Sequence, residues 1–194
     1  MFEYLLGIFW ALAYVFIAAG GFRFRNEKRI FMPLLSGGLN LAWEVNALRA
    51  SAGLWVHLLW LLLDLVILYQ NCRFLPTARR RSVYLAYVGA SVILLYGVFS
   101  LSSVRGMLLS SFVIDLIMAC EYLSVIKKLS PRFLAGIGVL RLLGDLFAWI
   151  ANMQASLFVK IIGIPVLLLN VFYVCCALEL QAQTAKRKPR AKRK

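Results

Sequence analysis

Five acidic residues lie within long apolar stretches of the sequence, where a carboxyl group is costly to bury: Glu44, Asp64, Asp115, Glu121 and Asp145. A charge at mid-membrane costs roughly 2.5–3.5 kcal/mol on the insertion scale, so such side chains are expected to face a bundle interior or a cavity. A carboxyl group removed from water favours its neutral, protonated form. These residues therefore offer the chemistry of a general acid.

Glu44 has neighbours that suit this role. Asn40 precedes it by four residues and shares its helix face, so the Asn40 amide can orient the carboxyl group. Trp43 is adjacent. No basic partner is evident nearby in the sequence, which argues against a purely structural role. Ordinary helix packing remains the alternative.

Asp64 lies near the middle of another apolar stretch, two helical turns after His57. A hydrogen bond between helices and a role in chemistry are equally open for this carboxyl group. We interpret His57, which lies close to the predicted outer boundary, as an interfacial residue rather than a ligand.

The remaining polar candidates form a second group. Arg141 and Asp145 are four residues apart and can pair on one helix face, which would neutralise an intramembrane charge. Asp115 is open to either interpretation, and Glu121 can reach Lys127 or Lys128. The tryptophans Trp43, Trp60 and Trp149 lie near these acids, and aromatic faces stabilise cations.

Several motifs are absent from the sequence. It has no acid cluster for metal–diphosphate binding, no phosphate-binding loop, no HExxH and no GxSxG. Its four cysteines show no CxxC spacing, so we predict neither a disulfide framework nor a metal site. We expect no metal and no cofactor.

Seven apolar stretches must position these residues. Hydrophobic residues make up 62% of the 194 residues, against roughly 45–50% in soluble domains, so lipid is the expected solvent. A membrane helix needs about 20 apolar residues. The qualifying stretches are 2–21, 30–48, 54–71, 82–101, 107–126, 133–152 and 159–180. The predicted fold is an all-α, polytopic membrane bundle over residues 1–180.

The basic residues alternate between the two sides of this bundle. Successive connections carry 4, 1, 4, 1, 3 and 1 Lys and Arg residues, and the segment 181–194 carries 7. Cytoplasmic loops are rich in Lys and Arg, so we predict an N-terminus outside and a basic, disordered cytoplasmic tail over 181–194. This alternation explains the net charge of +14 without nucleic acid as a partner.

Two of the stretches share a short sequence pattern. Asp64 follows Leu61-Leu62-Leu63, and Asn170 follows Leu167-Leu168-Leu169. With the fourth stretch as a linker, the first three and the last three would form a parallel 3+1+3 repeat, an architecture found among transporters. Chance similarity between leucine-rich helices is the alternative.

The second stretch resembles a known family. Met32-Pro33-Leu34 followed by Asn40, Trp43 and Glu44 is similar to helix 2 of the small membrane-bound terpene cyclases of fungal meroterpenoid and indole-diterpene pathways. The segment from Trp60 through Tyr69 to Phe74-Leu75-Pro76 also looks similar, as does Arg141-Leu142-Leu143-Gly144 with Trp149. The likeness is strongest over the second and third stretches.

The resemblance implies proton-initiated, metal-independent cyclisation of a prenyl or epoxyprenyl substrate, with Glu44 as proton donor. The family's second acid matches Asn170, in a setting that includes Tyr173, so this chain departs from the pattern there. Asp64 is our candidate replacement. Asn40, Trp43, Trp60, Arg141, Asp145, Trp149, Asn170 and Tyr173 are the expected substrate-binding residues. The expected partners are the lipid bilayer and a hydrophobic prenylated small molecule.

A different class of function fits the same residues. A small-solute transporter would use the mid-membrane acids as proton carriers, and the 3+1+3 pattern favours it. The sequence leaves the oligomeric state, the substrate and the ring pattern open.

Overall fold

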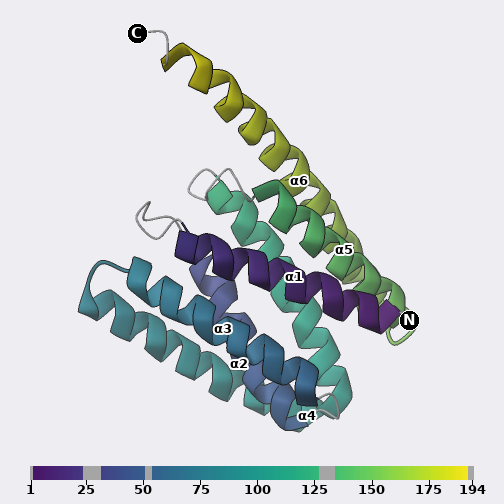
Figure 1. Ribbon diagram of the computed structural model, residues 1–194. Coiled ribbons are helices and arrows are strands. Elements are labelled where there is room, and N and C mark those ends of the chain that lie inside the picture. The colour runs from purple at the N-terminus through teal and green to yellow at the C-terminus, as the bar shows by residue number, and fades with distance from the viewer. Residues whose placement is uncertain (1, 24–31, 51–53, 127–133, 192–194) are drawn as a thin grey trace.

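A computed structural model describes residues 2–23, 32–50, 54–126 and 134–191. All regular structure in these ranges is helical: α1 (Phe2–Arg23), α2 (Leu34–Ala50), α3 (Leu54–Phe74), α4 (Ala78–Val125), α5 (Leu134–Asn152) and α6 (Leu157–Ala191). The helices pack side by side in one bundle (Figure 1). The basic connections at 24–31 and 127–133 lie outside the described residues.

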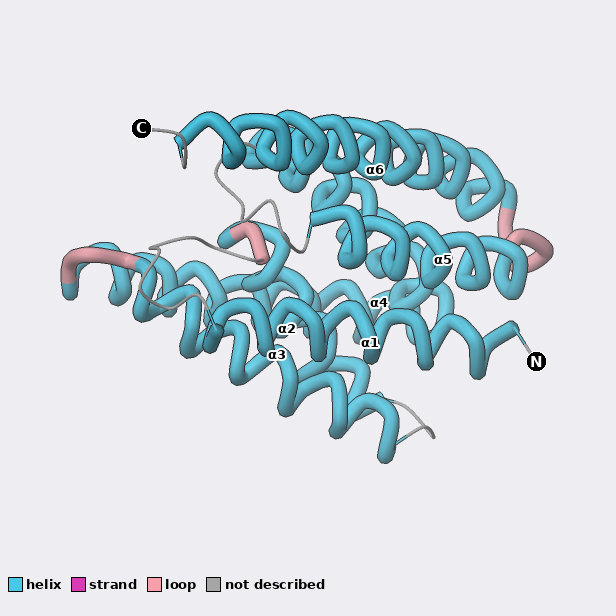
Figure 2. The backbone as a smooth tube through the Cα atoms, turned by 45° about the horizontal axis from the view of Figure 1, so that its top comes forward, coloured by secondary structure: helices cyan, strands magenta, loops and turns pink. Residues whose placement is uncertain are grey.

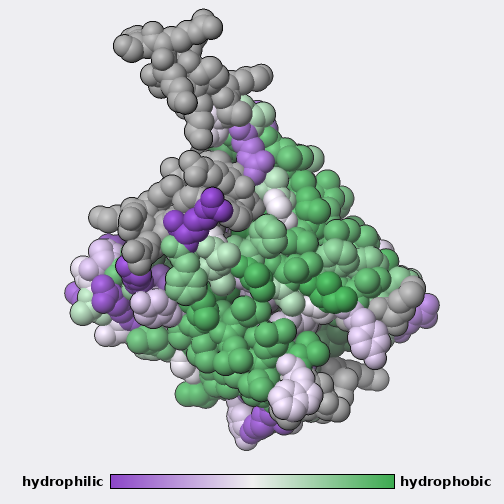
Figure 3. Space-filling view, viewed as in Figure 1, coloured by the Kyte–Doolittle hydropathy of each residue, from purple (hydrophilic) through white to green (hydrophobic). Residues whose placement is uncertain are grey.

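Six helical segments are long and apolar enough to cross a membrane: Tyr4–Arg23, Trp55–Phe74, Ala78–Ser100, Gly106–Val125, Leu134–Asn152 and Leu157–Thr184. Their outward faces carry large apolar side chains, such as Ile93 (74% exposed) and Leu157 (71% exposed), which favour lipid over water. Figure 3 shows this apolar surface across the face in view. The prediction of a multi-pass, all-α membrane bundle is confirmed.

The short helix α2 is the exception, because it is shorter and much of its surface packs against protein. It has 17 residues, and its buried side includes Ser36, Glu44 and Asn46. Polar side chains on a membrane helix are favoured only where they face the bundle interior. Glu121 of α4 accepts hydrogen bonds from the backbone N–H groups of Leu35 and Ser36, at 3.1 and 2.7 Å. This carboxylate therefore caps α2 at its positive end.

The fourth and fifth predicted stretches belong to one helix, α4, which folds back on itself. In a straight helix, Tyr87 and Glu121 would be about 51 Å apart. Both nevertheless contact Leu35, because the Tyr87 hydroxyl donates to the Leu35 carbonyl oxygen at 2.7 Å. We call residues 78–100 the outgoing arm and residues 106–125 the returning arm; Figure 1 shows their different directions. The predicted break between them is wrong, since helical backbone continues through 101–105.

Continuous helix through this bend has a physical reason. In lipid, backbone N–H and C=O groups have no water to bond with, so a helical turn keeps them satisfied within the chain. The backbone of α6 is also helical to Ala191, past the apolar span that ends at Thr184. This is beyond residue 180, where we placed the end of the membrane domain and the start of a disordered tail. Residues 192–194 are not described.

The helix packing follows a repeated pattern. The first half of the bundle consists of α1, α2 and α3, and the second half consists of the returning arm of α4, α5 and α6. In the first half, α1 and α2 each pack on α3. In the second half, α4 and α5 each pack on α6 in the same order. Between the halves, α1 packs on α5, and the returning arm of α4 packs on α2 in the corresponding way. These are the contacts that two parallel three-helix units would make about a two-fold axis, with the outgoing arm as linker. Figure 2 shows the packed helices from a second direction.

The two termini lie at opposite ends of the bundle (Figure 1). From the alternation of basic residues, the positive-inside rule predicts that the basic C-terminal segment lies in the cytoplasm. We expect a C-terminal epitope tag to resist external protease in intact cells, and an N-terminal tag to be cleaved. Permeabilised cells, in which both tags should be lost, are the control. Cleavage of the C-terminal tag in intact cells would reverse the orientation.

Candidate functional site

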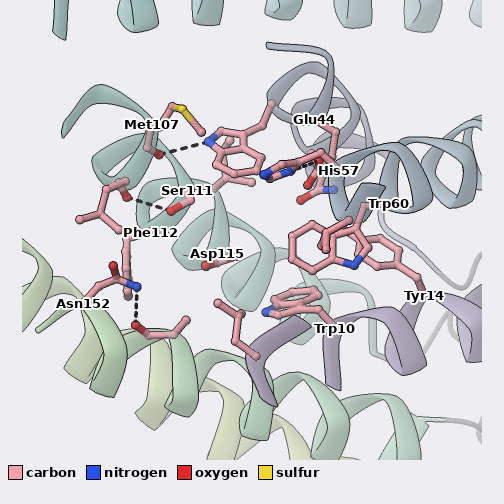
Figure 4. A pocket seen from close by; sticks show the side chains of 17 residues that line it. Trp10, Tyr14, Glu44, His57, Trp60, Met107, Ser111, Phe112, Asp115 and Asn152 are labelled. Atoms are coloured by element: carbon pink, nitrogen blue, oxygen red, sulfur yellow. Dashed lines mark hydrogen bonds and ion pairs between the residues drawn. The ribbon is translucent and has the colours of Figure 1, made fainter. Parts of the chain in front are cut away.

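A cavity of about 370 Å³ lies between the two halves of the bundle. Helices α1, α2 and α3, the returning arm of α4, and α5 all contribute to its wall. Most of the wall is apolar or aromatic. The aromatic members are Trp10, Tyr14, Trp43, His57, Trp60 and Phe112, and the other polar members are Asn40, Glu44, Ser111, Asp115 and Asn152. Figure 4 shows these side chains converging from different helices.

Glu44 and His57 form a pair on the wall of this cavity. Glu44 Oε2 lies 2.9 Å from His57 Nδ1, and the glutamate is only 3% exposed. The imidazole ring lies between two indoles, 5.8 Å from the Trp43 ring and 5.7 Å from the Trp60 ring. The sequence-based view that Glu44 lacks a basic partner is therefore wrong, because α3 supplies one. His57 is a cavity residue rather than an interfacial one.

The other two predicted α2 residues are also on the wall. Asn40 donates its side-chain N–H to Asp64 Oδ2 at 2.8 Å, so it holds Asp64 rather than Glu44. The Trp43 indole N–H donates to the Met107 carbonyl oxygen at 3.2 Å and to Ser110 Oγ at 3.1 Å. These bonds fix the indole against the returning arm of α4, where it forms one side of the cavity.

Asp64 lies behind the wall rather than in it. It is 1% exposed, and Asn40 stands between it and the cavity. Its second oxygen, Oδ1, has no hydrogen-bond partner among the described residues. The proposed replacement of the family's second acid by Asp64 therefore lacks direct access to a bound molecule.

Asp115, one of the five interior acids found in the sequence but not among the predicted site residues, lies on the cavity wall. It projects from α4 into the cavity, below Glu44 and His57 in the view of Figure 4. Within the described part of the chain, its carboxyl group makes no hydrogen bond and no ion pair. Its mid-helix position was the only signal in the sequence, and that position left a structural role and a chemical role equally open.

A second polar cluster lies deeper in the bundle. Arg141 is fully buried, with its guanidinium carbon 4.3 Å from the Tyr122 ring centre and 5.8 Å from that of Trp10. None of its guanidinium nitrogens has a hydrogen-bond partner among the described residues. Asp145 accepts a hydrogen bond from the Asn170 side chain instead of from Arg141. Arg141 and Asp145 therefore interact as charged neighbours without a direct hydrogen bond, and the guanidinium makes cation–π contacts instead.

The two Asp–Asn bonds repeat across the halves. In the first half Asn40 of α2 bonds Asp64 of α3, and in the second Asp145 of α5 bonds Asn170 of α6. Each bond joins the second helix of its half to the third helix. In the first half the asparagine is on the second helix and the aspartate on the third, whereas in the second half these positions are reversed.

The last two predicted site residues lie outside the cavity wall. Trp149 donates its indole N–H to the Lys160 carbonyl oxygen at 3.3 Å and packs where α5 meets α6. Tyr173 is buried against Tyr122, with ring centres 5.4 Å apart and its hydroxyl unbonded among the described residues. Neither contributes to the cavity wall.

Acidic side chains outnumber basic side chains in the described interior of the bundle. Glu44, Asp64, Asp115 and Asp145 lie at mid-depth in the described bundle, with Arg141 and His57 as their basic counterparts. This is opposite to the whole chain, whose net charge is +14. The described residues contain no cluster of ligands that could hold a metal ion. Protons or bound cations must therefore neutralise part of this carboxyl group excess.

Comparison of the chain with models of known protein families, with curated proteins and with solved structures finds no match.

Proposed function

We propose that the protein is a membrane-bound terpene cyclase that starts a metal-independent cyclisation by protonating a prenyl or epoxyprenyl substrate. The observation that carries the proposal is the position of Glu44, a buried carboxyl group on the wall of an aromatic cavity, paired with His57. A carboxyl group in such a setting is a suitable general acid. The resemblance of Asn40, Trp43 and Glu44 to the cyclase motif supports the same role.

In the first step, Glu44 gives its proton to an alkene carbon or to an epoxide oxygen. Protonation of an alkene leaves a carbocation, and protonation of an epoxide opens the C–O bond to give a hydroxyl group and a carbocation. A neighbouring double bond then attacks the cationic carbon and closes a ring. The indoles of Trp43 and Trp60 line the space in which this charge would move, and each aromatic face contributes roughly 0.5–2 kcal/mol.

The last step needs a group that removes a proton beside the final cation. Asp115 suits this step better than Asp64, because it reaches the cavity and is free of other partners in the described structure. Its carboxylate would take the proton as the C–H electron pair forms the product alkene. Return of a proton to Glu44, with His57 as the neighbouring group, would restore the starting state.

The proposal is tested with membranes that contain the protein. They are incubated with a panel of prenylated aromatic substrates and their terminal epoxides, and the products are analysed by chromatography and mass spectrometry. We expect a new isomer of one substrate, which is absent from membranes without the protein. The absence of any isomer across the panel would count against a cyclase and favour transport.

One observation favours the second candidate, a small-solute transporter. The helix contacts match between the two halves, and the cavity lies between them, as in transporters built from parallel repeats. The acids at mid-depth would then carry protons. Saturable, proton-dependent uptake of a solute by proteoliposomes would favour this function, whereas product formed by detergent-solubilised protein would favour the cyclase.

A further inference from the structure

We infer that the cavity is a binding site for a lipophilic organic cation, an ammonium group carried on an apolar chain, with Asp115 as its counter-ion. The first step is the state of the acids. Glu44 is paired with His57 and Asp64 with Asn40, whereas the carboxyl group of Asp115 makes no hydrogen bond or ion pair within the described residues and has Arg141 and Asp145 as its charged neighbours. An unpartnered carboxylate in an apolar cavity attracts a cation.

The second step is the nature of the wall. Trp10, Tyr14, Trp43 and Trp60 line the same cavity as Asp115. Aromatic faces around a cation are the usual means by which proteins recognise quaternary and tertiary ammonium groups. The charge of such a group is spread over its methyl groups, which also pack well against indole rings.

The third step argues against a divalent metal ion as the occupant. A Ca²⁺ or Mg²⁺ site requires several oxygen ligands around one point. The described residues contain no group of carboxylate, imidazole or thiol side chains that could hold a metal ion. One free carboxylate among aromatic rings suits an organic cation instead.

The surrounding charges leave the site acidic. Arg141 lies behind Trp10, with its guanidinium carbon 5.8 Å from that ring centre, and Asp145 lies one helical turn further along α5. His57, on the cavity wall, faces Glu44. The acids therefore outnumber the basic groups even with Arg141 and a protonated His57 both counted.

This inference concerns the cavity of the proposed cyclase but does not depend on cyclisation. In a cyclase, the ammonium group would take the place of the carbocation and inhibit the reaction. In a transporter, it would be cargo. Binding in the absence of turnover therefore separates the inference from the proposed function.

The test uses the full chain in lipid nanodiscs and two probes, N,N-dimethylgeranylamine and its neutral isostere with carbon in place of nitrogen. Tryptophan fluorescence reports binding. We expect the amine to bind at least about tenfold more tightly than the isostere, and Asp115→Asn to remove most of that difference. Equal binding of the two probes to the native protein would overturn the inference.

Matched variants control for charge and folding. Glu179→Gln removes an acid from the exposed part of α6, where it bonds Gln183, and should leave the preference for the amine unchanged. Asp115→Glu keeps the charge and should keep the preference, so it serves if Asp115→Asn does not fold. An unchanged preference in a folded Asp115→Asn variant would remove Asp115 from the site. A cyclase assay that fails while the amine still binds would refute only the proposed function.

Discussion

Glu44→Gln is expected to abolish formation of the cyclised product while the protein still inserts and folds. The amide keeps the size of the side chain and its ability to bond His57, but it cannot give up a proton as an acid does. General acids contribute roughly 10²- to 10⁴-fold, so we expect the initial rate to fall by at least about 100-fold. The rate is measured with the substrate identified from the panel, at equal amounts of folded protein.

The control for this variant is Glu179→Gln, which makes the same chemical change on an exposed part of α6. It should retain the full rate. Size-exclusion chromatography in detergent checks that both variants are folded. If folded Glu44→Gln retained the native rate, Glu44 would not be the proton donor, and Asp115 would become the remaining acid on the cavity wall.

Gly144→Leu should destabilise the protein by forcing α1 away from α5. A Cβ atom at Gly144 would lie 2.7 Å from Trp10 Cδ1 and 2.9 Å from its Nε1, so a larger side chain must push α1 away from α5. Overpacking of this kind costs roughly 1–3 kcal/mol, and the displaced indole would also distort the cavity. We expect a lower midpoint of thermal unfolding in detergent and loss of amine binding.

Gly136 provides a matched control on the same helix. It is exposed, and a Cβ atom there would meet nothing within 4 Å. Gly136→Leu should leave the unfolding midpoint unchanged or raise it slightly, because leucine favours helix over glycine by about 0.5–1 kcal/mol. Equal midpoints for Gly144→Leu and Gly136→Leu would show that α1 and α5 do not depend on close approach at Gly144.

The pairing of Glu44 illustrates what sequence-based reasoning missed in the candidate site. The sequence placed Glu44 correctly on an interior face, because Asn40 and Glu44 recur at helical spacing within an apolar stretch. It did not identify His57 as the partner, because the partner comes from α3 and the relative rotation of two helices depends on packing. Arg141 shows the opposite case. Asp145 lies one turn away on the same helix, but it bonds Asn170 on α6 rather than Arg141.

The path of α4 is a further example. Apolar length and the alternation of basic residues predicted two segments that cross the membrane in opposite directions, and the two arms of α4 correspond to them. The sequence suggested a break near Arg105, but the backbone remains helical through the bend. Local polarity cannot distinguish a loop from a bent helix, because both place the same residues at the membrane surface.

Asp115 and Glu121 show that the position of a residue along a helix does not determine which neighbour its side chain contacts. Both lie in the returning arm of α4, and both are among the five acids that the sequence places within apolar stretches. The structure directs Asp115 into the cavity and Glu121 to the N-terminus of α2, where it caps two backbone N–H groups. Six residues along one helix are about 9 Å, enough to reach a different neighbour.

The sequence by itself determined the solvent, the helical class and the approximate extent of most crossing segments. These follow from apolar composition and period, which act locally along each helix and require no knowledge of its neighbours. It also determined that carboxyl groups must lie within the bundle. Tertiary structure alone decided which of them are paired, which one faces the cavity, and which aromatic rings surround it, because those contacts join residues far apart in the chain through the packing of five different helices.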